Sequence, residues 1–178
     1  MLSDKLTKQL HDFSLIKIKF GKQNNIYFDV NLNSEKFNSI LENYTKHYKY
    51  KASKRIEYCL NNEKLVVKKD KKYLIEHTLI DNQFVTLDNF DILITNEEEK
   101  KSAFSDFSCT KDFHNIQNIE SVKILLNDYC ELYFNNNNDI NSITIVIKNT
   151  SSKNNKLNIN ELSSFISNLV QTIQKQLC

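Results

Sequence analysis

Apolar and polar residues alternate in short blocks along much of the chain. In the segment LIKIKFG, at positions 15–21, isoleucine and phenylalanine alternate with lysine, and Gly21, the only glycine, ends the run. Side chains two residues apart lie on the same face of a strand. The pattern therefore predicts a strand with one buried face.

Similar blocks predict further strands, separated by polar stretches. Because the chain has one glycine and no proline, we expect Asn and Asp to form its tight turns, with Asn61-Asn62 and Asp70-Lys71 as candidates. The stretch 97–118 is expected to be a surface loop carrying a short helix, pinned by Phe104, Phe107 and Phe113. The further strands are predicted at 26–30, 55–60, 64–69, 72–79, 83–87, 91–95, 122–126, 129–134 and 142–148.

Three segments have the helical spacing of apolar residues instead. One opens the chain after Ser3, and a second follows Ser34 as its expected cap and should lie across a sheet. The third begins at Asn158, with Glu161 completing a capping box, and has a long apolar stripe. We assign this stripe to the core, with a partner helix as the alternative for part of it.

Many short antiparallel strands with few helices favour a closed barrel, because closure removes exposed strand edges. The sequence thus predicts an α+β fold: an antiparallel barrel of about eight or more strands with a crossing helix and a carboxyl-terminal helix. We expect a single domain over residues 1–178.

The composition and charge of the chain limit the classes of function that we expect. The formal net charge is only +2 and Arg55 is the sole arginine, so no strong field for nucleic acid or membranes is expected. The opening residues do not resemble a signal peptide, no apolar run is long enough to span a bilayer, and the four cysteines lack metal or redox spacing. A cytoplasmic protein with reduced thiols and no membrane association is the expectation. The histidines also lack ligand spacing; a Cys109–His114 nucleophilic pair is a less favoured alternative.

The order of motifs resembles one known family. LIKIKFG, the helix after Ser34, the basic run KLVVKKDKKYLIEH, the acid-ended DILITNEE and the late strand SITIVIKN follow one another along the chain. This order is similar to the triphosphate tunnel metalloenzymes, in particular the RNA triphosphatase domains of viral and fungal-type mRNA capping enzymes. The resemblance implies a tunnel-like barrel.

The departures from the family pattern concern its metal site. The resemblance implies a Glu-x-Glu pair in the first strand and another in the last, but Leu15 and Lys17 stand at the first and Ser142 and Thr144 at the second. Residues 15–22 and 140–150 contain no acid at all. Divalent Mg²⁺ or Mn²⁺ needs such carboxylates. We therefore expect no catalytic residues, no metal cofactor and no enzymatic activity.

The leading hypothesis is an inactive tunnel-like domain. It would act as a protein-interaction or stabilising subunit of an mRNA capping or viral-type transcription assembly, with a protein or a second copy of the chain as partner.

Two alternatives stay open. One is a divergent polynucleotide 5′-triphosphatase that uses Mg²⁺ or Mn²⁺ and other acids, with the candidates Glu57, Glu97, Glu98 and Glu131. The other is a module that binds RNA 5′ ends or nucleotides without cleaving them. Its expected phosphate contacts are Arg55, Lys68, Lys69, Lys71 and Lys72. Against this second alternative, the lysine run 64–72 is first interpreted as a solvated edge strand protected from aggregation.

Overall fold

The computed structural model describes residues 2–11, 13, 15–25, 27–60, 63–69, 71–103, 115–149 and 158–178. Within them the helices are α1 (Leu2–Leu10), α2 (Ser34–His47) and α3 (Ile159–Leu177). The strands are β1 (Leu15–Gln23), β2 (Phe28–Asp29), β3 (Tyr50–Leu60), β4 (Glu63–Lys68), β5 (Lys71–Thr86), β6 (Asp91–Ala103), β7 (Asn115–Leu125), β8 (Cys130–Asn137) and β9 (Ile140–Lys148).

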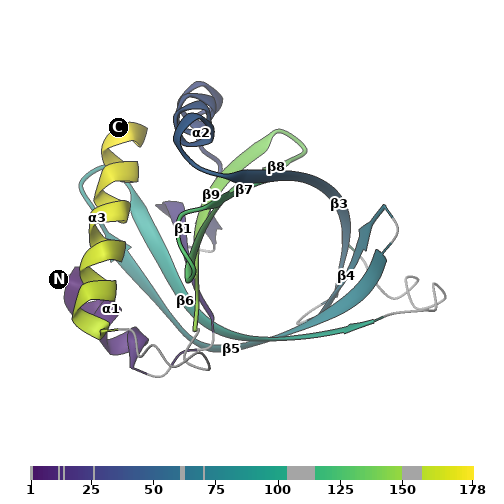
Figure 1. Ribbon diagram of the computed structural model, residues 1–178, viewed down its shortest axis with the longest axis horizontal. Coiled ribbons are helices and arrows are strands. Elements are labelled where there is room, and N and C mark those ends of the chain that lie inside the picture. Colours follow the sequence, from purple (N-terminus) through teal and green to yellow (C-terminus); the bar gives the residue numbers. More distant parts are fainter. Residues whose placement is uncertain are drawn as a thin grey trace.

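Eight of these strands close into an antiparallel barrel. Their order is β1-β6-β5-β4-β3-β7-β8-β9, and β9 pairs with β1 again to complete the ring. The short β2 pairs with the end of β1 outside this ring. Figure 1 shows the barrel with α1 and α3 together on one outer side and α2 beside it. The predicted α+β barrel is confirmed.

The alternating pattern of β1 gives its two faces different roles. Ile16, Ile18 and Phe20 are fully buried and belong to the hydrophobic core that includes α1 and α3. The lysines between them line the inside of the barrel. The core therefore lies between the helices and the outer face of the strands, which leaves the barrel interior free for polar side chains.

Helix α3 supplies one continuous face of this core. Its buried apolar residues recur at helical spacing, as the sequence predicts, and are Leu162, Ile166, Val170, Ile173 and Leu177. Helix α2 packs on the outer face of the barrel, where the ring of Phe37 lies 5.6 Å from that of Phe134 on β8. The barrel wall is thus stabilised from outside.

Caps and turns partly follow the predictions. The side chain of Asn158 accepts hydrogen bonds from the first turn of α3, as expected. For α2 the cap is Asn33 and not Ser34, because Asn33 Oδ1 accepts from the backbone N–H of Lys36. Asn138 and Asp139 make the β8–β9 turn with φ angles of 50° and 69°, a conformation that Asn and Asp tolerate well.

Three strand predictions were wrong. Residues 83–87 do not form a separate strand: β5 runs through to Thr86, with a register shift between Leu79 and Asp81. The predicted loop 97–118 is strand up to Ala103 and again from Asn115, because hydrogen bonding across the barrel wall outweighs the polar composition. The basic run is not an edge strand, since β4 pairs with both β3 and β5.

Several sequence predictions fall on residues outside the described ones. These are the turn residues Asn61, Asn62 and Asp70, the anchors Phe104, Phe107 and Phe113, and the alternative nucleophilic pair Cys109 and His114. Among the described helices, none is long and apolar enough to cross a bilayer.

The glycine of β1 has a steric role. A Cβ at Gly21 would come within 2.0 Å of the backbone oxygen of Asp29 on β2. Only glycine allows β2 to approach β1 so closely. The glycine does not end the strand as predicted, because β1 continues to Gln23.

Candidate ligand-binding site inside the barrel

All eight barrel strands line a cavity of about 610 Å³, the barrel cavity. Its lining residues occupy alternate positions, such as Lys17 and Lys19 on β1 and Ser142, Thr144 and Val146 on β9. A period of two is the geometry of strands that show one face inward. The volume lies in the range of small-ligand sites.

The lining of the barrel cavity is strongly basic. Among the described residues, nine basic side chains line it against two acidic ones, Glu57 and Glu99. The whole chain, in contrast, has a net charge of only +2. The fold therefore concentrates positive charge inside the barrel. The basic residues are Lys17, Lys19, Lys51, Arg55, Lys64, Lys68, Lys101, Lys123 and Lys148.

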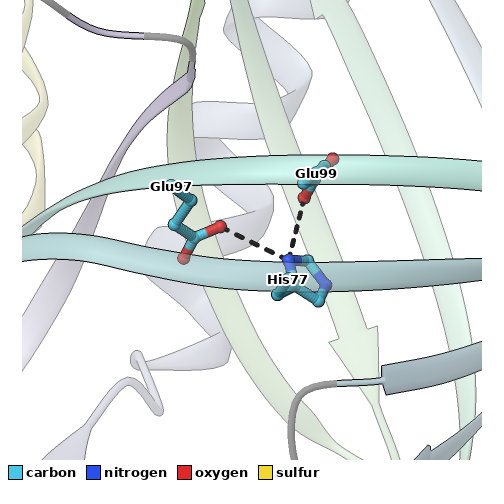
Figure 2. Close-up of side chains that lie close together, drawn as sticks. All are labelled: His77, Glu97 and Glu99. Atoms are coloured by element: carbon cyan, nitrogen blue, oxygen red, sulfur yellow. Dashed lines mark ion pairs between the residues drawn. The ribbon is translucent and has the colours of Figure 1, made fainter.

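One cluster joins β1, β5 and β6. Lys17 Nζ lies 3.1 Å from Oε2 of Glu97 and donates a hydrogen bond of 2.8 Å to Oε1 of Glu99. His77 Nδ1 lies 3.6 Å and 3.3 Å from the same two oxygens. Figure 2 shows His77 on β5 directed toward both glutamates of β6. We refer to His77, Glu97 and Glu99 as the His-Glu-Glu cluster.

The electrostatics of this cluster keep Lys17 and Glu97 charged. Burial alone would raise the pKa of Glu97, but His77 and Lys17 outweigh it and lower that pKa to about 2. Burial likewise opposes the charge of Lys17, yet Glu97 and Glu99 raise its pKa above the usual value. The ammonium is thus the resident cation between the two carboxylates.

The carboxylate of Glu57 is also paired with basic side chains. Glu57 Oε2 accepts a hydrogen bond of 2.6 Å from Nε of Arg55, and Lys64 Nζ lies 3.5 Å from its other oxygen. The Nη1 of Arg55 also donates to Ser121 Oγ at 2.7 Å.

Glu131 is paired in the same way. It is only 7% exposed, and it lies 2.5 Å from Lys148 Nζ and 3.3 Å from Lys123 Nζ. Burial acts to raise the pKa of both Glu57 and Glu131, but their basic partners lower it overall.

Other cations of the cavity have no such partner. Within the described part of the chain, Lys19, Lys51, Lys68 and Lys101 form no ion pair with a carboxylate. Burial lowers the pKa of Lys68, and the positive charges of Arg55 and Lys101 lower it further. Several positive charges held close together in a recessed site attract an anion. This is the main chemical property of the barrel cavity.

Aromatic and hydroxyl groups complete the lining. The ammonium of Lys101 lies 4.0 Å from the ring centroid of Tyr73, and burial raises the pKa of Tyr133 to about 12. Burial also raises the pKa of Tyr73, so both tyrosines remain neutral hydrogen-bond donors. A wider cavity of about 1760 Å³ under α2 shares the lining residues Arg55, Lys68 and Ser121 with the barrel cavity, so the two lie next to each other.

Comparison with known proteins identifies the architecture. Neither the protein-family models nor the curated protein sequences contain a match to this chain. Among solved structures, the S. pombe Pct1 RNA triphosphatase in complex with the Spt5 CTD superposes with a TM-score of 0.73 at 12% identity, over 98% of this chain and 91% of that chain. The chain has the fold of an RNA triphosphatase tunnel. The Mimivirus capping enzyme triphosphatase gives a TM-score of 0.58 at 13% identity, over 97% and 95% of the two chains.

In this triphosphate tunnel fold, β1 and β9 are the strands in which the family resemblance implied the two Glu-x-Glu pairs. They face the cavity with Leu15, Lys17 and Lys19 and with Ser142 and Thr144, and neither strand carries an acid. The acids that do reach the cavity already hold ammonium or guanidinium groups. With these partners in place the residues do not fit a divalent ion at the expected strands.

The fold separates the predicted phosphate contacts into two groups. Arg55 and Lys68 line the barrel cavity. Lys69, Lys71 and Lys72 are exposed and are absent from its lining, although Lys69 borders the wider cavity under α2. Lys68 is the last residue of β4, whereas Lys69 lies in the turn that follows.

The predicted acids divide in the same manner. Glu57 lines the cavity, and Glu97 and Glu131 pair with lysines that line it, whereas Glu98 is exposed and does not.

Sequence reasoning missed most of the charged lining, namely Lys17, Lys19, Lys51, Lys64, Lys101, Lys123 and Lys148 together with Glu99 as a candidate acid. These residues are the polar positions of strands that alternate between polar and apolar side chains. They can be assigned to the cavity only once it is known that the apolar positions face outward.

Proposed function

We propose that this chain is a non-cleaving binding protein for polyphosphate groups, such as the 5′ triphosphate of RNA or of a nucleotide. One observation carries the proposal: nine basic side chains, four of them without a carboxylate partner in the described chain, converge on a cavity with two acidic lining residues. Ammonium groups bind phosphate as point charges, and Arg55 adds a planar donor group. No step of this proposal requires a metal.

The absence of cleavage follows from the same geometry. A phosphoryl transfer would need the cavity acids to hold a metal or to activate water. Glu57, Glu97 and Glu131 are instead paired with basic residues and have lowered pKa values, so none is poised as a base near neutral pH. We expect no phosphate release from triphosphate-ended RNA with Mg²⁺ or Mn²⁺.

The proposal is tested by calorimetric titration of tripolyphosphate into the purified protein in EDTA. We expect binding, and about tenfold weaker binding by Lys68→Gln because one charge-assisted contact is lost. Lys71→Gln is the matched control: it removes the same charge from an exposed position that lines neither cavity and should leave affinity within about twofold. Absence of binding in EDTA, or equal effects of both variants, would contradict the proposal.

A second candidate is the protein-interaction role in an mRNA capping or transcription assembly. It is favoured by exposed apolar residues on β5, where Leu79, Ile80 and Phe84 are 55%, 50% and 39% exposed. One similar structure is a complex with a protein segment, the Spt5 CTD. Cross-linking and mass spectrometry of wild type and Leu79→Lys should identify a partner lost only from the variant, while tripolyphosphate binding persists.

A further inference from the structure

The His-Glu-Glu cluster brings one imidazole nitrogen and two carboxylates to one point of the barrel wall. His77 lies opposite Glu99 in the β5–β6 register, and Glu97 is two residues away on the same face of β6. The three ligand atoms all lie within 4.8 Å of one another. Because they come from two hydrogen-bonded strands, the backbone fixes their spacing.

The distances within the cluster match a small coordination sphere. Zinc binds imidazole nitrogen and carboxylate oxygen at roughly 2.0–2.2 Å, so neighbouring ligands of a tetrahedral site are about 3.3–3.6 Å apart. His77 Nδ1 lies 3.3 Å from the Glu99 oxygen and 3.6 Å from the Glu97 oxygen. Little movement of these side chains is needed to hold an ion.

A cation already occupies this position. The ammonium of Lys17 reaches across from β1 and contacts both oxygens that a metal would use, at 3.1 Å and 2.8 Å. The place therefore attracts positive charge, which is an observation independent of the arrangement of the ligands. A divalent ion and this ammonium cannot share it, because they would repel each other at contact distance.

We infer that His77, Glu97 and Glu99 form a latent binding site for a divalent transition-metal ion such as Zn²⁺, which the Lys17 ammonium keeps closed as a tethered competing cation. The cluster uses β5 and β6, so it differs from the positions on β1 and β9 at which the glutamate pairs were expected. An imidazole ligand favours Zn²⁺ over Mg²⁺, which prefers oxygen ligands only. The inference goes beyond the proposed function and requires no phosphate.

The test is a titration of Zn²⁺ into the purified protein without phosphate, with the visible absorption of bound Co²⁺ as a second readout. We expect weak binding by wild type and at least about tenfold tighter binding by Lys17→Gln, because the competing charge is gone. Adding His77→Ala or Glu99→Gln to Lys17→Gln should remove the gain. Mg²⁺ should show no comparable gain.

The matched control is Lys19→Gln, which removes a lysine from the same strand and the same cavity but not from the cluster. It should leave Zn²⁺ affinity unchanged. The inference is overturned if Lys17→Gln binds Zn²⁺ no more tightly than wild type, if Lys19→Gln gains equally, or if the gain survives loss of His77. If Lys17→Gln fails to fold, Lys17→Met provides a second test, because methionine is uncharged, apolar and of similar length. Tripolyphosphate binding is measured separately, so failure of either proposal leaves the other standing.

Discussion

At the scale of single residues, the chemistry of the barrel cavity depends on which cations are already paired. Arg55 and Lys64 share Glu57, whereas Lys19 and Lys68 have no carboxylate partner among the described residues. A paired cation attracts an incoming phosphate less strongly, because its field is partly neutralised. The affinity of the cavity should therefore respond to its acids as well as to its lysines.

We expect Glu57→Gln to bind tripolyphosphate about three- to tenfold more tightly than wild type, since it frees Arg55 and Lys64. The same change should lower the free energy of unfolding, because two recessed cations lose their counter-charge. Calorimetry and urea denaturation measure the two effects. Glu98→Gln, at an exposed position, is the control and should change neither; weaker binding by Glu57→Gln would contradict the expectation.

At the scale of elements, each strand of the barrel wall has a polar inner face and, near the helices, an apolar outer face. On the inner face, Glu131 of β8 pairs with Lys123 of β7 and Lys148 of β9, so one carboxylate links three neighbouring strands. On the outer face, α3 packs its apolar stripe against the same sheet. Both kinds of contact hold the ring closed.

The inner contact predicts a pH dependence. The folded-state pKa of Glu131 lies below the ordinary 4.5, so its stabilisation is present above that pH and is lost as the pH falls through the lowered value. Wild type should exceed Glu131→Gln in unfolding free energy by about 1 kcal/mol near neutral pH, and the difference should shrink in acid. Urea denaturation between neutral pH and acid measures it. A difference that is constant with pH would indicate lost packing instead.

The outer contact predicts a large loss on truncation. Ile166 of α3 is 0% exposed, and Ile166→Ala should lower the free energy of unfolding by about 2–5 kcal/mol through lost burial and a cavity. Gln171→Ala, on the exposed side of α3, should change it by less than about 0.5 kcal/mol. Equal effects of the two changes in urea denaturation would argue against the packing of α3 on the barrel.

At the scale of the whole molecule, the distribution of charge matters more than its sum. The chain is nearly neutral overall, while the barrel cavity is basic. A neutral exterior gives little attraction for the backbone of nucleic acid, whereas a compact polyphosphate can enter the field of the cavity.

This distribution predicts selectivity for the phosphate end. RNA with a 5′ triphosphate should compete with bound tripolyphosphate at least about tenfold better than the same RNA with a 5′ hydroxyl, because only the former places several charges inside the barrel. A fluorescence competition assay at fixed ionic strength measures the ratio. Equal competition by both RNAs would indicate binding on the outer surface.

The sequence by itself determined the class of fold and most of the elements. Period-two alternation in β1, helical spacing in α3, and Asn and Asp at the β8–β9 turn are local signals, set by side-chain direction and backbone preference within a few residues. Two residues predicted as phosphate contacts, Arg55 and Lys68, line the barrel cavity, but the sequence did not indicate which other side chains accompany them.

Only the tertiary structure decided which face of each strand points inward and which charges meet. Lys17 and Glu97 are far apart along the chain, yet strand pairing brings them within 3.1 Å, and Lys68 and Lys69 are adjacent in sequence but only Lys68 lines the cavity. The net charge of +2 does not indicate how the charged side chains are distributed between the cavity and the exterior. Electrostatic interactions depend on distance in space, and barrel closure sets that distance through pairings that are not local in the sequence.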